Sequence, residues 1–152
     1  MYFSITFSRS DDKTGIEIKR NTWEDWKLIP TSPPMVESPE PYMNYAEIPG
    51  RKQGPIDLSE VLSGAPSYGN SEGSWEFVLD ERGYSRTETY QLMKNFLHGR
   101  KVKIYLEEDP THYYEGRLSI PKPEPGKSNT GFTINYTISP IKYRLDGTED
   151  GI

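Results

Sequence analysis

The sequence predicts a mainly β protein: an antiparallel β-sandwich or open barrel with one α-helix, about residues 85–98, and a long extended arm, about residues 30–62. Several segments alternate apolar and polar residues with a period of two, which is typical of half-buried strands. Only one segment combines helical spacing with capping residues. The thirteen prolines and thirteen glycines cluster largely between these segments, where they favour turns and extended chain.

The length of 152 residues allows one domain with a modest core, so we interpret residues 1–152 as a single domain. The apolar fraction is low, at 33%, but the aromatic fraction of 12% falls in the patterned segments. This combination favours a folded domain with long polar loops over disorder. A domain with so small a core often gains stability from partners, which is a first indication of an oligomer.

The first patterned segment, residues 3–8, carries an apolar side chain at every second position and is expected to be a strand. Residues 10–15 form a turn. Thr22 is the expected N-cap of a single helical turn. Residues 26–29 would then form a short strand that leads into the arm.

The arm is predicted from five prolines between residues 30 and 41. Proline lacks an amide donor and disfavours the helical conformation of the residue before it, so this stretch is extended and lies outside any sheet interior. Too few residues precede it to form an independent domain, which favours an arm over a domain linker. Within the arm we expect a strand at 42–48, a polar turn at 49–55 and a short extended piece at 56–62.

A turn-rich stretch, residues 63–73, is followed by an alternating strand at 75–80. The helix comes next: Ser85 and Glu88 fit a capping box, and Gly99 stands where a left-handed residue is favoured. Four residues are expected to form its buried apolar stripe: Leu92, Met93, Phe96 and Leu97.

Three alternating strands complete the chain, at residues 102–106, 114–120 and 132–139. A polar hairpin loop joins the first two. A longer loop, residues 121–131, precedes the third, and we assign it no role. The antiparallel order of these strands leads to the sandwich or open barrel.

The composition argues against several classes of function. The charge is 18 − 23 = −5, so general electrostatic attraction to nucleic acid is absent. The densest basic run, Arg100, Lys101 and Lys103, is interpreted as a solvated turn and strand start. Cysteine is absent, which excludes disulfides and thiolate metal sites. Neither a secretory signal nor an apolar stretch of about 18 residues is present, so we expect a soluble chain made in the cytoplasm with no membrane partner.

The best candidates for a metal or acid–base site are Glu107, Glu108 and Asp109, with His112 nearby. Alternation along a strand would send the two glutamates to opposite faces, which favours a plain hairpin loop. His98, at the end of the helix, is interpreted as a cap rather than a ligand, because its partial positive charge is favourable there.

No nucleophile elbow, phosphate loop or dinucleotide fingerprint occurs, so we expect no enzymatic activity, no catalytic residues, no cofactor and no metal. Tyr84 and Tyr113 could bind sugar, although pairing across strands is favoured for such tyrosines.

One segment indicates a particular protein family, whereas the patterns described so far are common to many proteins. Residues 44–51 (NYAEIPGR) and 54–60 (GPIDLSE) resemble the "NYxxIPGRxGxIDLSE" arm of Dit-like distal tail proteins, the siphophage tail component family of phages that infect Gram-positive bacteria. Other features follow in the order of that family: the "T-x-x-D-W" element at 22–26, the "LHGK" step at 97–101, the "DDPxxYYxGR" hairpin at 109–116 and the "PYKY" end at 140–143.

The resemblance implies the ring-forming domain of a structural virion or prophage subunit. Its ring, expected to be hexameric, would join the tail tube to the tail tip or baseplate, with a lumen through which DNA can pass. The implied partners are further copies of the chain, the tail-tube protein and a tail-tip or tail-associated protein, and no nucleic acid sequence is recognised. The implied location is the virion tail, assembled in the bacterial cytoplasm.

The expected subunit interface lies on the arm. It comprises Asn44, Tyr45, Ile48, Pro49, Gly50, Arg51, Ile56, Asp57, Leu58, Val61 and Leu62. Its aliphatic residues would supply apolar contacts, and an extended arm can add to a neighbour's sheet. Arg51 either pairs with a neighbouring carboxylate or is solvated.

Members of this family often carry a second, carbohydrate-binding domain after the ring domain. Because this chain stops soon after Tyr143, we expect no such domain. Three alternatives remain: a major tail-tube subunit, which shares the same architecture, a carbohydrate-binding adhesion module, and, third, a wall hydrolase.

Overall fold

The computed structural model describes residues 3–43, 45–46, 49–50, 54, 56–57, 68–80, 82–123 and 131–150. The elements in chain order are β1 (Ile5–Ser10), β2 (Glu17–Asn21), β3 (Leu28–Pro30), β4 (Tyr45–Ala46), β5 (Ile56–Asp57), β6 (Ser71–Leu79), α1 (Arg86–Leu97), β7 (Lys101–Leu106), β8 (His112–Ser119) and β9 (Gly131–Arg144). No described helix is long and apolar enough to span a membrane.

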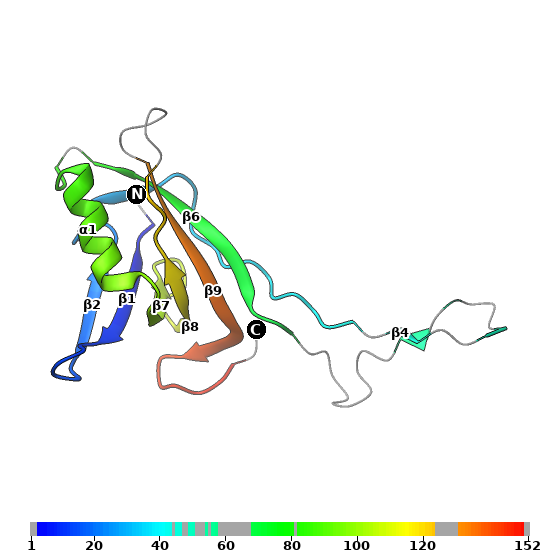
Figure 1. The fold of residues 1–152 in the computed structure, drawn as a ribbon. Coiled ribbons are helices and arrows are strands. Elements are labelled where there is room, and N and C mark those ends of the chain that lie inside the picture. Colours follow the sequence, from blue (N-terminus) through cyan, green and yellow to red (C-terminus); the bar gives the residue numbers. More distant parts are fainter. Residues whose placement is uncertain are drawn as a thin grey trace.

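Seven strands form one antiparallel sheet, in the order β2-β1-β7-β8-β9-β6-β3, which curls into a half-barrel (Figure 1). β4 and β5 pair with each other, apart from this sheet. The predicted fold class, mainly β with one helix and an extended arm, is confirmed. Of the two architectures expected, the open barrel describes the sheet.

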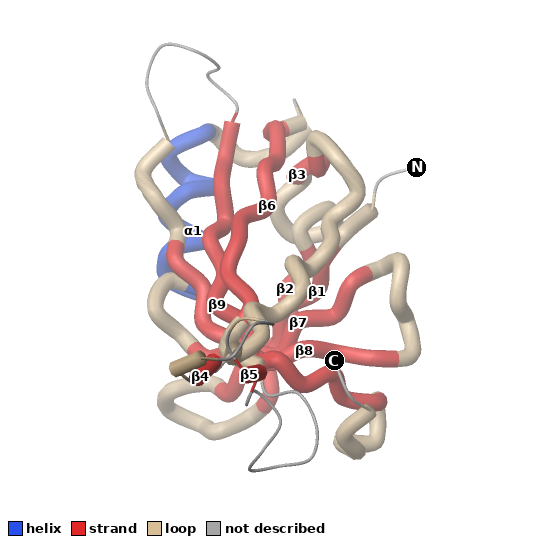
Figure 2. The backbone as a smooth tube through the Cα atoms, turned by 90° about the vertical axis from the view of Figure 1, so that its right-hand side faces the viewer, coloured by secondary structure: helices blue, strands red, loops and turns tan. Residues whose placement is uncertain are grey.

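The core lies between the curled sheet and α1, which packs against one side of it (Figure 2). Alternate residues of the longer strands, β1, β6, β7, β8 and β9, face this core, as the period-two pattern predicted. The fully buried members on the strands include Ile5, Phe7, Ile104, Ile134 and Ile138.

The helix was predicted accurately at both ends. The Ser85 side chain accepts a hydrogen bond from the Glu88 amide, and Gly99 adopts a left-handed φ of 73° after the helix. The predicted buried stripe is wrong at one position. Leu92 is 40% exposed, whereas Thr89, one turn before Met93, is fully buried in the helix face that meets the sheet.

Two side chains fasten the end of α1 to the sheet. The Arg9 guanidinium donates to the carbonyl oxygen of Phe96 at 2.9 Å, which places a positive charge at the helix C-terminus. His98 Nδ1 accepts the amide hydrogen of Ile120 at 3.0 Å, so this nitrogen is unprotonated. The predicted cap is confirmed, because His98 is the C-cap residue of α1 and its amide donates to the Lys94 carbonyl.

The predicted helical turn near residue 22 is a hydrogen-bonded turn with a different cap. The side-chain oxygen of Asn21 accepts the amides of Trp23 and Glu24. Thr22 is instead buried, and its hydroxyl accepts the amide of Ile5 on the neighbouring strand. The prediction was wrong because Thr22 finds a partner distant in sequence.

Strand boundaries also differ from the prediction. β2 was missed, β6 begins at Ser71 rather than residue 75, and β9 continues through Pro140 to Arg144. Tyr42 and Met43 lie outside β4, so the strand expected at 42–48 is shorter at its start. The strand boundaries are set by pairing with neighbouring strands. This pairing cannot be predicted from local sequence patterns.

Candidate assembly interface

The arm, defined here as residues 31–70, leaves the sheet at the end of β3 and returns at the start of β6. Its outgoing limb runs away from the body toward β4 (Figure 1). The two limbs are tied together near the body, because the Gly69 amide donates to the Glu40 carbonyl at 2.8 Å and Pro41 forms an antiparallel bridge with Tyr68.

Two buried aromatic side chains anchor the root of the arm. The indole Nε1–H of Trp75 donates to the Met35 carbonyl at 2.9 Å, and the Tyr136 hydroxyl accepts the Glu37 amide at 2.9 Å. The two rings stack on each other with centroids 4.4 Å apart. Burial, together with the Glu37 charge, raises the pKa of Tyr136 above its ordinary value, so the hydroxyl stays protonated. Because these hydrogen bonds go to backbone groups, they fix the path of the outgoing limb.

Gly73 makes this anchor possible. It lies on β6 directly opposite Tyr136 of β9. A Cβ added at Gly73 would lie 2.4 Å from the Tyr136 hydroxyl and 3.1 Å from Cγ of Glu37. A side chain at this position would therefore separate the phenol from the arm.

The outgoing limb is buried on one side and exposed on the other. Pro34 is buried and Val36 packs on the core, whereas Met35 is 71% exposed. Further along, Tyr42 and Met43 are each 65% exposed. Large exposed apolar side chains on a projecting segment are a feature of contact surfaces.

The predicted interface residues belong to the stretch of the arm between residues 44 and 62. Six of them lie outside the described residues: Asn44, Ile48, Arg51, Leu58, Val61 and Leu62. In the β4–β5 pair, Tyr45 lies opposite Asp57 and Ala46 opposite Ile56. Pro49 and Gly50 are exposed in a turn, where Gly50 has a left-handed φ of 82°. The role of these residues stays a prediction.

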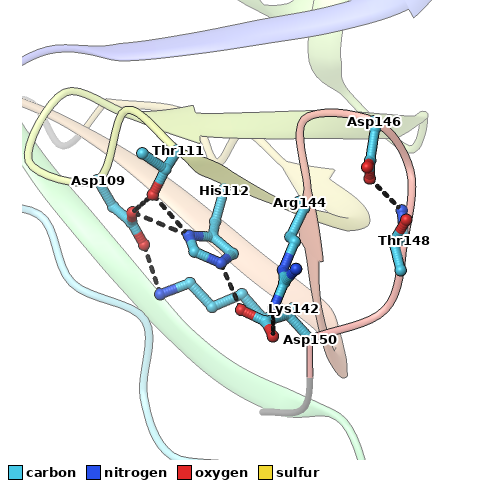
Figure 3. A network of polar contacts seen from close by, with 8 residues as sticks. All are labelled: Asp109, Thr111, His112, Lys142, Arg144, Asp146, Thr148 and Asp150. Carbon is cyan, nitrogen blue, oxygen red and sulfur yellow. Dashed lines mark hydrogen bonds and ion pairs between the residues drawn. The ribbon is translucent and has the colours of Figure 1, made fainter.

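Apart from the arm, a cluster of charged and polar side chains lies where the β7–β8 loop meets the end of β9 (Figure 3). His112 lies between two carboxylates: its Nε2 is 2.6 Å from Asp150 and its Nδ1 is 3.3 Å from Asp109. Lys142 forms an ion pair with Asp109, and Arg144 forms one with Asp150 at 2.9 Å. The cluster thus fastens the C-terminal turn to the hairpin.

The charges of this cluster stabilise one another. Arg144, and then His112, lower the pKa of Asp150. Burial alone would raise the pKa of Asp109, but the hydrogen bond and charge of Lys142 outweigh it and lower that pKa. The same hydrogen bond raises the pKa of Lys142. Asp109, Asp150 and Lys142 are each held in the charged form, which suits a structural ion-pair network.

Of the predicted metal-site candidates, only Asp109 and His112 come together. The two carboxylates beside His112 contact opposite ring nitrogens and so cannot share one ion with it. Glu107 instead caps the start of the sheet, where it accepts the Ser4 amide at 2.6 Å, and Glu108 is exposed. Within the described part of the chain, no group of three or more His, Cys, Asp or Glu side chains could hold a metal.

The tyrosines considered as sugar ligands have different positions. Tyr113 is 5% exposed and packs against Tyr105 and Tyr143 on the adjacent strands, each with a centroid separation of 5.4 Å. Pairing across strands, the favoured interpretation, is confirmed for Tyr113. Tyr84 is exposed just before α1.

The arm anchor was missed in the sequence because its partners are distant. Trp75 and Tyr136 were predicted only as apolar strand positions, and their polar atoms meet residues 40 and 99 positions away. A glycine inside a strand, Gly73, was the available signal, but it fell in a stretch predicted as a turn.

Comparison with known proteins gives a similarity at the level of the fold. No protein-family model matches the sequence, and no curated protein sequence matches it. Among solved structures, the chain is similar to SPP1 Dit (gp 19.1), described as a paradigm of the hub adsorption apparatus in phages that infect Gram-positive bacteria. The TM-score is 0.61 at 15% sequence identity, over 95% of this chain and 52% of SPP1 Dit.

The chain therefore spans about half the length of SPP1 Dit. At this identity the similarity concerns the fold. The resemblance to Dit-like distal tail proteins that the sequence motifs predicted is confirmed at that level: the described chain has the fold of the matching part of SPP1 Dit.

Proposed function

We propose that this chain is a non-enzymatic structural subunit of a phage or prophage tail, which assembles into a ring, hexameric by the sequence resemblance, between the tail tube and the tail tip or baseplate. The observation that carries the proposal is the fold shared with SPP1 Dit over 95% of the chain. The order of the motifs along the sequence supports it independently.

The arm is the assembly device in this proposal. Among its described residues, those that pack on the core lie at its root, and that root is fixed by Trp75 and Tyr136. An outgoing limb rich in proline has less conformational entropy to lose when it docks. A contact between the arm of one subunit and a different surface of the next is heterologous, and such contacts close into a ring when the rotation between subunits permits.

The partners in this proposal are further copies of the chain, the tail-tube protein and a tail-tip protein, and the site of action is the virion tail. The ring lumen would allow DNA to pass without sequence recognition. The ion pairs around His112 have a structural role in it, since they tie the C-terminal turn to the β7–β8 hairpin.

Negative-stain electron microscopy of the chain mixed with its tail-tube protein tests the proposal. The intact chain should give closed rings of a fixed number of subunits. A chain that lacks residues 44–60 should remain folded by near-ultraviolet circular dichroism but give no rings. Open stacks of the intact chain would indicate a tail-tube subunit instead, and rings from the deleted chain would show that the arm does not join subunits.

A further inference from the structure

The face of the sheet that points away from the core, over β2, β1, β7 and β8, carries a charged row. Ser8 lies opposite both Lys19 of β2 and Lys103 of β7, and Lys103 lies opposite Glu115 of β8. Residues directly opposite each other in antiparallel strands share a face. Because Phe7, the neighbour of Ser8, is buried in the core, this row lies on the opposite face, which we call the outer face.

The outer face is hollowed and carries more basic than acidic side chains, with Lys101 in an ion pair with Glu115 at 4.0 Å. A shallow groove on it is lined in part by Ser8, Glu17, Lys101, Lys103 and Glu115. The charged side chains of these four strands that face outward are Glu17, Lys19, Lys101, Lys103, Glu115 and Arg117, which gives 4 − 2 = +2 in a chain whose total is −5.

Two lysines of this surface form cation–π contacts with tyrosine rings. The ammonium of Lys19 lies 5.3 Å from the ring centre of Tyr105, and that of Lys103 lies 5.2 Å from the ring centre of Tyr113. Both lysines are exposed, and their positions lower the pKa of Glu17, after the larger effect of the Ser8 hydroxyl. The face therefore presents positive charges at defined places.

The arm carries the opposite charge. Its residues include five acidic side chains, Glu37, Glu40, Glu47, Asp57 and Glu60, and two basic ones, Arg51 and Lys52, for a net charge of 2 − 5 = −3. At its root Glu37 and Glu40 are exposed, close in sequence to the exposed apolar side chains of Tyr42 and Met43. An acidic segment with exposed apolar anchors complements a basic groove.

The two features lie on different parts of the sheet. The arm leaves beside β3 and β6, at one edge of the strand order, whereas β2, β1 and β7 lie at the other edge (Figure 1). Each limb of the arm, fully extended, would reach roughly 60 Å, well beyond the width of a small domain. A contact between two different surfaces of identical molecules is heterologous and can propagate around a ring.

We propose that the outer face of β2, β1, β7 and β8 receives the arm of the next copy of this chain, with Lys101 and Lys103 as its central charges. The inference rests on the proposed function, because it names the surface on which the arm acts.

Charge reversal tests the receiving surface. In the same assembly assay with the tail-tube protein, the variant Lys101→Glu/Lys103→Glu should raise the concentration needed for rings by about tenfold or more, because like charges now face each other. The matched control, Lys13→Glu/Lys122→Glu, reverses two exposed lysines elsewhere and should assemble like the native chain. Adding Glu37→Lys/Glu40→Lys to the first variant should restore rings at least in part.

Crosslinking gives a readout that does not depend on the stability of a charge-reversed variant. Because the chain contains no cysteine, Met43→Cys/Lys103→Cys carries the only two thiols. A short bismaleimide should join neighbouring copies into multimers in assembled samples. The control Met43→Cys/Thr87→Cys, with its second thiol on the exposed side of α1, should give far fewer.

The outcomes separate the two proposals. Suppose that deletion of residues 44–60 abolishes rings, but the Lys101→Glu/Lys103→Glu variant assembles normally and Met43→Cys/Lys103→Cys does not crosslink. The arm then docks elsewhere, and the inference is wrong. If rings form without the arm, the proposed function of the arm fails as well.

Discussion

The hydroxyl of Tyr136, on β9, accepts the amide hydrogen of Glu37 at 2.9 Å and so connects a central strand of the sheet to the arm. The phenol reaches the arm across Gly73 of the intervening strand, where any Cβ would collide with it. A local feature of the sheet therefore sets the path of a segment that projects from the body.

Replacing Gly73 by alanine should loosen the arm root. The added methyl group would lie within 2.4 Å of the Tyr136 hydroxyl, so the ring must move and the bond to Glu37 is lost. We expect the free energy of unfolding to fall by about 1 to 3 kcal/mol and limited proteolysis of residues 31–43 to accelerate.

Gly69→Ala is the matched control, because its Cβ would meet no atom closer than 3.6 Å. It should change neither the unfolding free energy nor the proteolysis rate appreciably. Equal effects of the two substitutions in urea melts and protease digests would show that Tyr136 does not hold the arm.

Much of the fold could be predicted from local patterns, and its exceptions share one cause. The helix at 86–97 carries its own caps, and the strands β7 to β9 alternate clearly, so each was recognised. β2 (Glu17–Asn21) lies at the sheet edge with few buried residues and shows no such alternation. Thr22 was misinterpreted, and the bond of His98 to Ile120 was missed, because each side chain accepts a backbone amide distant in sequence.

The candidate interface was likewise only partly predictable. The arm was predicted as the interface from its prolines and the family-like motif, which are local signals. The anchor formed by Trp75 and Tyr136 depends on residues brought together only by the folded sheet, and no spacing in the sequence indicates it.

Phe96→Ala should be strongly destabilising. The ring is 7% exposed, packs edge-on against Trp26 at 6.2 Å and lies beneath the Arg9 guanidinium at 4.6 Å. We expect a loss of about 3 to 5 kcal/mol in the free energy of unfolding from denaturant melts. Leu92→Ala, on the exposed side of the same helix, should cost less than about 1 kcal/mol. A similar cost for both would mean that α1 is rotated on the sheet.

The ion pair of Asp109 with Lys142 should make stability depend on pH in the acid range. The folded-state pKa of Asp109 lies below its ordinary value of 3.8. The pair therefore contributes stability above that pH and loses it as the pH falls through the lowered folded-state pKa.

Asp109→Asn should be less stable than the native chain at neutral pH, and the difference in unfolding free energy should shrink as the pH falls below about 4. Urea melts at a series of pH values measure it. Glu108→Gln, a charge change on an exposed neighbour, is the control and should show little difference at any pH. A gap for Asp109→Asn that stays constant down to pH 3 would assign the loss to packing rather than charge.

The bond from the Ile120 amide to His98 Nδ1 predicts which substitutions the end of α1 tolerates. Asparagine carries an acceptor oxygen at the same branch point as Nδ1, so His98→Asn should retain most of the stability. His98→Ala leaves the amide without its partner and should cost about 1 kcal/mol in urea melts near neutral pH. If His98→Asn is as unstable as His98→Ala in the same melts, the imidazole acts through its packing, and the hydrogen bond to Ile120 contributes little.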